Sequence, residues 1–188
     1  MAANGGRHQL GPDSGRLTLR TYRSGLAAQA GHDLTIDVTR WSGELDEPAE
    51  GAQGALDATI DLNSLAIREG RGGVKPLSDR DRRDITGQAR KQLDTGHYPE
   101  ASYAATGFTP DDTGGGAIDG TLTLHGQSRP LRLEVSKTGD GQYRATATVV
   151  QSQFGIKPYS GMFGALKLRD DVDIEVTVTL PAAPGSPS

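Results

Sequence analysis

Strict alternation of apolar and polar residues is the feature that most constrains what this chain can fold into. In the segment LTIDV, Leu34, Ile36 and Val38 fall on one face and Thr35 and Asp37 on the other. A strand places successive side chains on opposite faces, so such a segment has one buried face and one wet face. Eight segments follow this pattern: residues 17–23, 34–41, 55–62, 100–106, 121–126, 130–135, 143–149 and 171–180.

Strands with one wet face are typical of antiparallel sheets. Turn-forming sequences separate several of the segments, among them GDGQ and PDDTGGG, and glycine, at 26 of 188 residues, is about twice as frequent as usual. Eight strands that share one apolar face can close into a barrel, which removes the exposed edges. We therefore predict an all-β fold, an eight-stranded antiparallel barrel, although alternation alone is equally compatible with a sandwich.

One segment has helical rather than strand periodicity. Ile85, Ala89 and Leu93 recur at four-residue spacing, which predicts a helix over residues 78–93. Ser78 followed by Asp81 resembles a capping box, and Gly96 is the candidate residue for the helix end. Residues 24–31 are a candidate for a second, short helical turn.

The two ends of the chain are rich in small and polar residues. We predict flexible tails over residues 1–15 and 181–188, and a single domain over residues 16–180. The first residues lack the apolar run of a signal peptide, and no run is long enough for a transmembrane helix. The expected location is therefore cytoplasmic.

Charge and residue usage exclude several classes of function. The net charge is −4 with both signs interspersed, so neither nucleic acid nor an anionic membrane is an expected partner. There is no cysteine, and the four histidines lack zinc-binding spacing. The acidic residues of DRDRRD do not meet the requirements of a calcium loop, because Asp84 and Arg90 occupy the positions of the required Gly and Glu. We predict no metal and no cofactor.

The adjacent residues His32 and Asp33 suggest a catalytic pair at first sight. On a strand, however, their side chains point to opposite faces, so they cannot form a dyad. Regular alternation places His32 inward with Leu34, near one mouth of a barrel, and Asp33 outward. A histidine satisfied by backbone groups, a polar group at a pocket mouth and a catalytic base remain the three interpretations.

The segment FGIKPYSGMFGALK, residues 154–167, has neither periodicity. It contains Phe154, Met162 and Phe163 among three glycines. Such a segment is either a loop packed into the core or a lid over one end of a barrel that contacts an apolar ligand.

Taken together, several segments resemble the YceI-like, polyisoprenoid-binding family. The similarity covers residues 16–180 and includes GHDLTIDVTRWSGEL, ATIDLNSLAI, DRDRRDITGQARKQLDTGHYPEASYAAT, GTLTLHGQSRPLRLEV and DDVDIEVTVTL, in the order and spacing of the family. The chain departs from it at Gln151–Gln153, where Arg is frequent in the family, and at Tyr103 and Ala105, where Phe and Ser are typical.

The resemblance implies a lipocalin-like barrel with a helical segment near one end. It also implies a long apolar ligand, such as an isoprenoid quinone, a polyisoprenoid or a fatty-acyl derivative, and a homodimer. A carrier without catalytic residues is the preferred hypothesis. The alternatives are an enzyme that uses His32 or His125 as a base, and an interaction module whose barrel is filled by its own side chains. The candidate ligand-binding residues are His32, Leu34, Ile36, Val38, Leu56, Ile60, Leu62, Tyr103, Leu122, Leu124, Leu133, Val149, Phe154, Met162 and Phe163.

Overall fold

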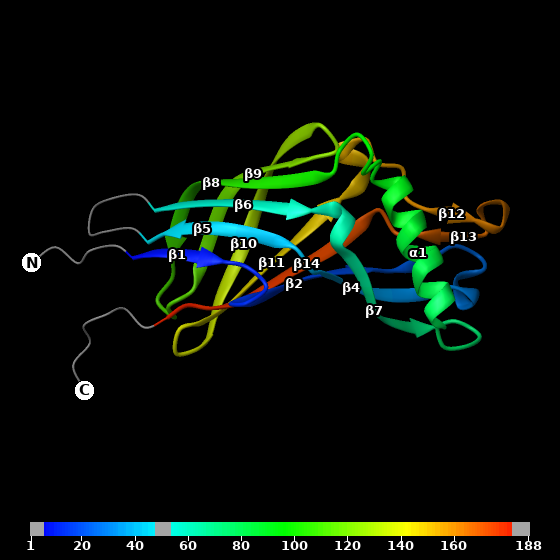
Figure 1. Ribbon diagram of the computed structural model, residues 1–188, viewed down its shortest axis with the longest axis horizontal. Coiled ribbons are helices and arrows are strands. Elements are labelled where there is room, and N and C mark those ends of the chain that lie inside the picture. Colours follow the sequence, from blue (N-terminus) through cyan, green and yellow to red (C-terminus); the bar gives the residue numbers. More distant parts are fainter. Residues whose placement is uncertain (1–5, 48–53, 182–188) are drawn as a thin grey trace, which may run out of the picture.

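The computed structural model describes residues 6–47 and 54–181 (Figure 1). Eleven strands form one strongly curled antiparallel sheet, and three short strands form a second sheet at one end of the molecule. The strands are β1 (Arg7–Leu10), β2 (Gly15–Thr21), β3 (Arg23–Ser24), β4 (His32–Val38), β5 (Trp41–Asp46), β6 (Ala55–Asp61), β7 (Leu65–Gly72), β8 (Glu100–Pro110), β9 (Gly116–Leu124), β10 (Gln127–Gly139), β11 (Gln142–Val150), β12 (Ser160–Gly161), β13 (Leu166–Leu168) and β14 (Asp171–Thr179).

The large sheet closes on itself because consecutive strands bend together at one corner. β4 continues into β5 through Thr39 and Arg40, and β6 continues into β7 through the short 3₁₀-helix η2 (Leu62–Ser64). β5 pairs with β6 and β4 pairs with β7. At the corner itself, Asp61 N donates to Arg40 O and Thr39 N donates to Ser64 O, both at 3.1 Å.

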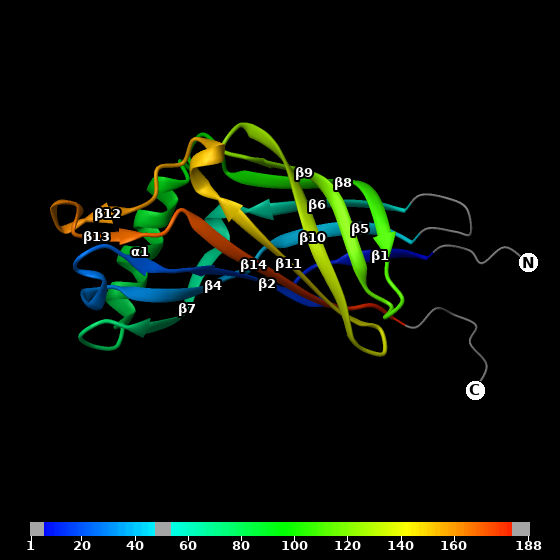
Figure 2. The same ribbon diagram turned by 180° about the vertical axis from the view of Figure 1, so that it is seen from behind.

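The pairing therefore continues around a complete ring. β2 pairs with β4 on one side and with β14 on the other, and β14, β11, β10, β9, β8 and β6 follow in order back to β5. The prediction of an all-β antiparallel barrel is confirmed, and the sandwich alternative is not (Figures 1 and 2).

The number of strands differs from the predicted eight. The ring has eight passes of the chain, but the sheet has eleven strands, because bends split the β1–β2, β4–β5 and β6–β7 passes in two. Residues 7–10, which we expected in a flexible tail, form β1 because they extend β2 along β5, with Leu10 opposite Gly43. Residues 1–5 of that tail and 182–188 of the C-terminal tail lie outside the described residues.

The α-helix α1 (Asp79–Gln92) lies across the side of the barrel where β7 pairs only with β4 (Figure 1). Ser78 is its N-cap, and a complete capping box with Asp81 is present, as predicted. The prediction for Gly96 is wrong, because the helix ends at Gln92 with Leu93 as its C-cap, and Asp94 adopts the left-handed conformation with φ of 48°. An aspartate tolerates this conformation better than most residues, so no glycine is required.

Polar contacts hold α1 to the barrel at several points. The Arg82 guanidinium donates to the backbone oxygens of Ile67 and Arg68, both at 2.9 Å, and Arg90 donates to Asn63 O at 2.7 Å. The predicted second helical turn is also present, as the 3₁₀-helix η1 (Ala28–Ala30). The remaining 3₁₀-helices are η3 (Gln151–Phe154) and η4 (Met162–Gly164).

Candidate functional site

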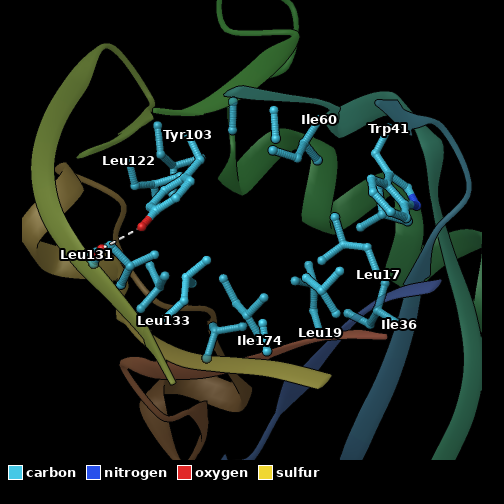
Figure 3. Close-up of a pocket in the computed structure, with 18 of the residues that line it drawn as sticks. Leu17, Leu19, Ile36, Trp41, Ile60, Tyr103, Leu122, Leu131, Leu133 and Ile174 are labelled. Carbon is cyan, nitrogen blue, oxygen red and sulfur yellow. Dashed lines mark hydrogen bonds between the residues drawn. The ribbon is translucent and has the colours of Figure 1, made fainter. Parts of the chain in front are cut away.

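The barrel encloses a cavity of about 1260 Å³. Ligand pockets commonly measure about 300–1,000 Å³, so this cavity is larger than usual. Figure 3 shows apolar side chains converging on it from opposite walls. All eight passes of the ring contribute, with Leu17, Leu19, Ile36, Trp41, Ile60, Tyr103, Leu122, Leu133, Val149 and Ile174 among the lining residues.

The cavity stays open because many inward positions carry small residues. Ala58, Ala101, Ala117 and Ala145 are inward positions of strands, and none has a side chain that reaches across the barrel. A barrel of eight chain passes is just wide enough for its own side chains to fill, or to hold one small ligand. A cavity of this size argues against the self-filled barrel of the interaction-module hypothesis.

Tyr103 is the main polar residue in the middle of the cavity wall. Its side chain is buried, and its hydroxyl donates to Leu131 O at 3.1 Å (Figure 3). The same hydroxyl also donates to Ile118 O at 3.2 Å. Burial, assisted by the negative charge of Asp119, raises the pKa of the Tyr103 phenol to about 12. The phenol is therefore neutral at physiological pH. Its ring lies over Gly120, where any Cβ atom would overlap it.

His32 lies on the cavity wall at the end of the barrel near η1 and β13, and it is half-buried. Its Nε2 atom is 2.9 Å from Lys75 O, and a ring N–H donates in this contact. Asp33 points to the opposite face, where its carboxylate accepts from Arg23 N at 2.9 Å. The prediction that the two residues do not form a dyad is confirmed. Because its Nε2 donates to a backbone carbonyl, that atom is not available as a base.

Twelve of the fifteen candidate residues line the cavity. They are His32, Leu34, Ile36, Val38, Leu56, Ile60, Leu62, Tyr103, Leu122, Leu124, Leu133 and Val149. The alternation of β2 and β14 predicted their inward positions, but these positions were not included among the candidate ligand-binding residues. The structure adds four of them to the cavity lining: Leu17, Leu19, Ile174 and Val176. It also adds Ile85 and Ala89, from the apolar face of α1.

Phe154, Met162 and Phe163 do not line the cavity. Phe154 is 2% exposed and packs at the end of β11, outside the lining. Met162 and Phe163 are 58% and 113% exposed, because η4 turns them away from the barrel at the tip of the β12–β13 hairpin. The alternation of β13 places Leu166 and Leu168 on the cavity instead. An irregular segment without periodicity offered no signal for this choice.

The polar lining residues concentrate toward the two ends of the cavity. Asp84, Gln88 and Gln92 of α1 lie at one end, and Glu47 and Thr109 at the other. The middle is formed by apolar side chains apart from Tyr103. This distribution suits a long apolar chain with a polar group near one end.

Groups suited to metal binding are missing from the described part of the chain. Over residues 6–47 and 54–181, no three His, Asp or Glu side chains are placed to hold a metal ion. In the same residues, the structure contains no helix with the length and apolar character needed to cross a membrane.

The model of the YceI-like domain matches residues 17–180. A UPF0312 protein of Shewanella sp. (strain W3-18-1) is 30% identical over 112 residues, which cover 55% of this chain and 54% of that protein. The chain thus spans about half the length of the curated relatives it matches. Among solved structures, BcnA of Burkholderia cenocepacia has a TM-score of 0.63 at 16% identity, over 89% of this chain and 96% of BcnA. A YceI protein of Campylobacter jejuni has a TM-score of 0.52 at 17% identity, over 78% and 84% of the two chains.

Proposed function

Because this chain belongs to the YceI-like family, we propose that it is a carrier that holds one long apolar molecule inside its barrel. The observation that carries this proposal is the cavity of about 1260 Å³ with its apolar wall. The chemical class we propose is an isoprenoid quinone, a polyisoprenoid or a fatty-acyl derivative. Each of these classes combines a long apolar body with a small polar end.

The size of the cavity sets what it can hold. At roughly 30 Å³ for each water-sized group, the cavity has room for about 40 such groups. This is enough for a long acyl chain or for an isoprenoid of several units. Burial contributes about 0.8 kcal/mol for each methylene group. A stretch of about 15 carbons would contribute about 12 kcal/mol, and association costs of several kcal/mol leave a micromolar to nanomolar Kd.

The geometry supports binding rather than catalysis at this site. The Nε2 atom of His32 donates to a backbone carbonyl, which leaves Nδ1 as the one lone pair of that ring, and the high pKa of Tyr103 keeps its proton in place at neutral pH. General base catalysis needs a group that accepts a proton near the operating pH. We therefore propose that the protein binds and releases its ligand unchanged.

Lipid extraction of the purified protein, followed by mass spectrometry, is the first test. We expect a single long-chain molecule in roughly equimolar amount. A protein that carries nothing after purification, and that also fails to bind a fluorescent fatty-acid probe, would contradict the proposal.

Filling the cavity provides a matched test. Ala58 on β6 and Ala145 on β11 point inward, whereas Ala104 on β8 is exposed and lies outside the cavity lining. The double variant Ala58→Phe/Ala145→Phe should lose affinity for the probe by at least tenfold, because two phenyl rings occupy the ligand's space. Ala104→Phe should bind as the wild type does. Equal affinity in all three proteins would show that the ligand binds elsewhere.

A further inference from the structure

Three loops that are far apart in the sequence meet at the end of the barrel near α1. They are residues 22–31, 70–78 and 155–168, and we call them the mouth loops (Figures 1 and 2). Ala27 N donates to Ala165 O at 2.9 Å, and Ser24 pairs with Lys167. The loop of residues 70–78 lies beside the first loop, because His32, which directly follows the first loop, pairs with Gly72.

The mouth loops carry most of the large apolar side chains that the described surface exposes. Leu26 is 101% exposed, Val74 85%, Met162 58% and Phe163 113%. At least one lies on each loop. Isolated surface apolar residues are ordinary, but four on three adjacent loops at one end of a barrel mark a contact surface.

The backbone holds two of these side chains outward at a cost. Met162 and Phe163 have φ of 49° and 54°, in the left-handed region that non-glycine residues seldom adopt. Such conformations cost about 1–3 kcal/mol each and occur preferentially at functional sites.

The charge of the mouth loops is opposite to that of the whole chain. The chain carries a net charge of −4, but none of the residues in the mouth loops is acidic. Five of them are basic: Arg23, Arg71, Lys75, Lys157 and Lys167. Arg71 pairs with Glu69 at 2.9 Å and Arg23 lies 3.8 Å from Asp33. For the three lysines, no ion pair occurs with any described residue. In the sequence these residues are dispersed, and only the fold brings them together.

Apart from Glu69 and Asp33, which pair with arginines of the mouth loops, acidic residues also lie at the start of α1. Asp81 accepts from Ser78 in the capping box, and Asp79 precedes it. The same helix carries five basic residues against three acidic ones, so it does not reverse the local charge.

The cavity extends to the mouth loops. The cavity lining includes Gly31 of the first loop and the adjacent His32. It also includes Tyr159 and Leu166 of the third loop. A surface that contacts the mouth loops would therefore lie next to the end of the cavity.

We propose that the mouth loops dock on an anionic lipid bilayer. The exposed apolar side chains enter the interface between head groups and acyl chains, and the lysines contact the phosphate groups. Separate apolar tips with cations between them suit a fluid bilayer better than a folded partner, which would need a continuous groove or patch. The proposal that apolar cargo then passes directly between bilayer and cavity rests on the proposed function, whereas docking itself does not.

Co-sedimentation with two kinds of vesicle tests the docking. One contains phosphatidylcholine mixed with phosphatidylglycerol and the other phosphatidylcholine alone. We expect stronger binding to the mixed vesicles and weaker binding at high salt. The variant Lys75→Gln/Lys157→Gln/Lys167→Gln should weaken binding to the mixed vesicles by about fivefold for each lysine. The control Lys91→Gln/Lys137→Gln changes the two lysines outside the mouth loops and should bind as the wild type does.

The apolar contribution is tested separately. Phe163→Asn should weaken binding to both vesicles by about tenfold, because it removes an inserted ring, while asparagine tolerates the left-handed backbone. Wild-type protein that sediments with neither vesicle would overturn docking, as would an equal loss in the control. Self-association abolished by Phe163→Asn, without vesicle binding, would also overturn it and assign this face to a second copy.

Probe binding in solution separates this proposal from the carrier function. The mouth-loop variants should bind the fluorescent fatty-acid probe normally, and Ala58→Phe/Ala145→Phe should bind vesicles normally. Normal probe binding with no vesicle binding overturns docking alone. Normal vesicle binding with no probe binding by the wild type overturns the carrier function alone.

Discussion

The volume of the cavity and its apolar wall predict how affinity depends on the length of a ligand. Saturated fatty acids of increasing length differ only in methylene groups, each of which enters an apolar wall. At about 0.8 kcal/mol for each buried methylene, Kd should fall by about fourfold for each added carbon. Because the cavity of about 1260 Å³ has room for about 40 water-sized groups, this trend should continue through the longest soluble members of the series.

A shortened cavity should end the trend early. In the variant Ala58→Phe/Ala145→Phe, the phenyl rings block part of the path along the barrel, so added methylenes beyond the block remain in water. The assay is displacement of a fluorescent fatty-acid probe at constant pH and salt, with Ala104→Phe as the control for the substitution itself. Kd values that do not change with length in the wild type would refute burial along the barrel. An identical slope in the cavity-filled variant would refute it equally.

Three further predictions concern residues that shape the barrel. Ser78→Ala removes the N-cap of α1 and should lower the free energy of unfolding by about 1 kcal/mol, measured by urea denaturation; an unchanged midpoint would contradict a role for the capping box. Gly120→Ala places a Cβ atom against the ring of Tyr103 and should destabilise the barrel by about 1–3 kcal/mol, whereas a Tyr103→Phe background should not relieve the clash. Hydrogen bonds from Thr148 and then from Tyr22 lower the pKa of Asp173, so its contribution to stability is present above the unfolded pKa of about 4 and is lost as pH falls through the lower folded value. Asp173→Asn should therefore reduce the loss of stability in acid, as thermal unfolding at a series of pH values would show; an unchanged pH dependence would contradict it.

Alternation and capping patterns predicted the parts of the fold that are determined by residues close together in the sequence. Leu34, Ile36 and Val38 line the cavity as their spacing predicted, and the capping box begins α1 at Ser78. Such features depend on neighbours within a few residues. They are therefore visible in the sequence.

Features that depend on distant parts of the chain were not predictable in this way. The bend at Thr39 and Arg40 is stabilised by η2, about twenty residues later, so the additional strands of the ring had no local signal. Phe163 resembles a core residue in composition, but η4, at the tip of the β12–β13 hairpin, turns it outward. The size of the cavity depends on which small residues face one another across the barrel, which alternation alone does not reveal.

The cavity wall is built in two ways, from paired strands and from a helix, and this difference has a consequence for how the ligand of the proposed carrier would be exchanged. A wall of paired strands opens only when a row of backbone hydrogen bonds breaks together. The helix α1 forms its part of the wall with no fully buried side chain, and it is attached by side-chain contacts such as that of Arg82 and by the packing of Ile85 and Ala89 rather than by a backbone ladder. Outward rotation of this one helix would open an entrance to the cavity and leave the ring of paired strands intact. We therefore expect loading and unloading to be limited by the motion of α1, and amide exchange in α1 to be faster than in the strands that surround it.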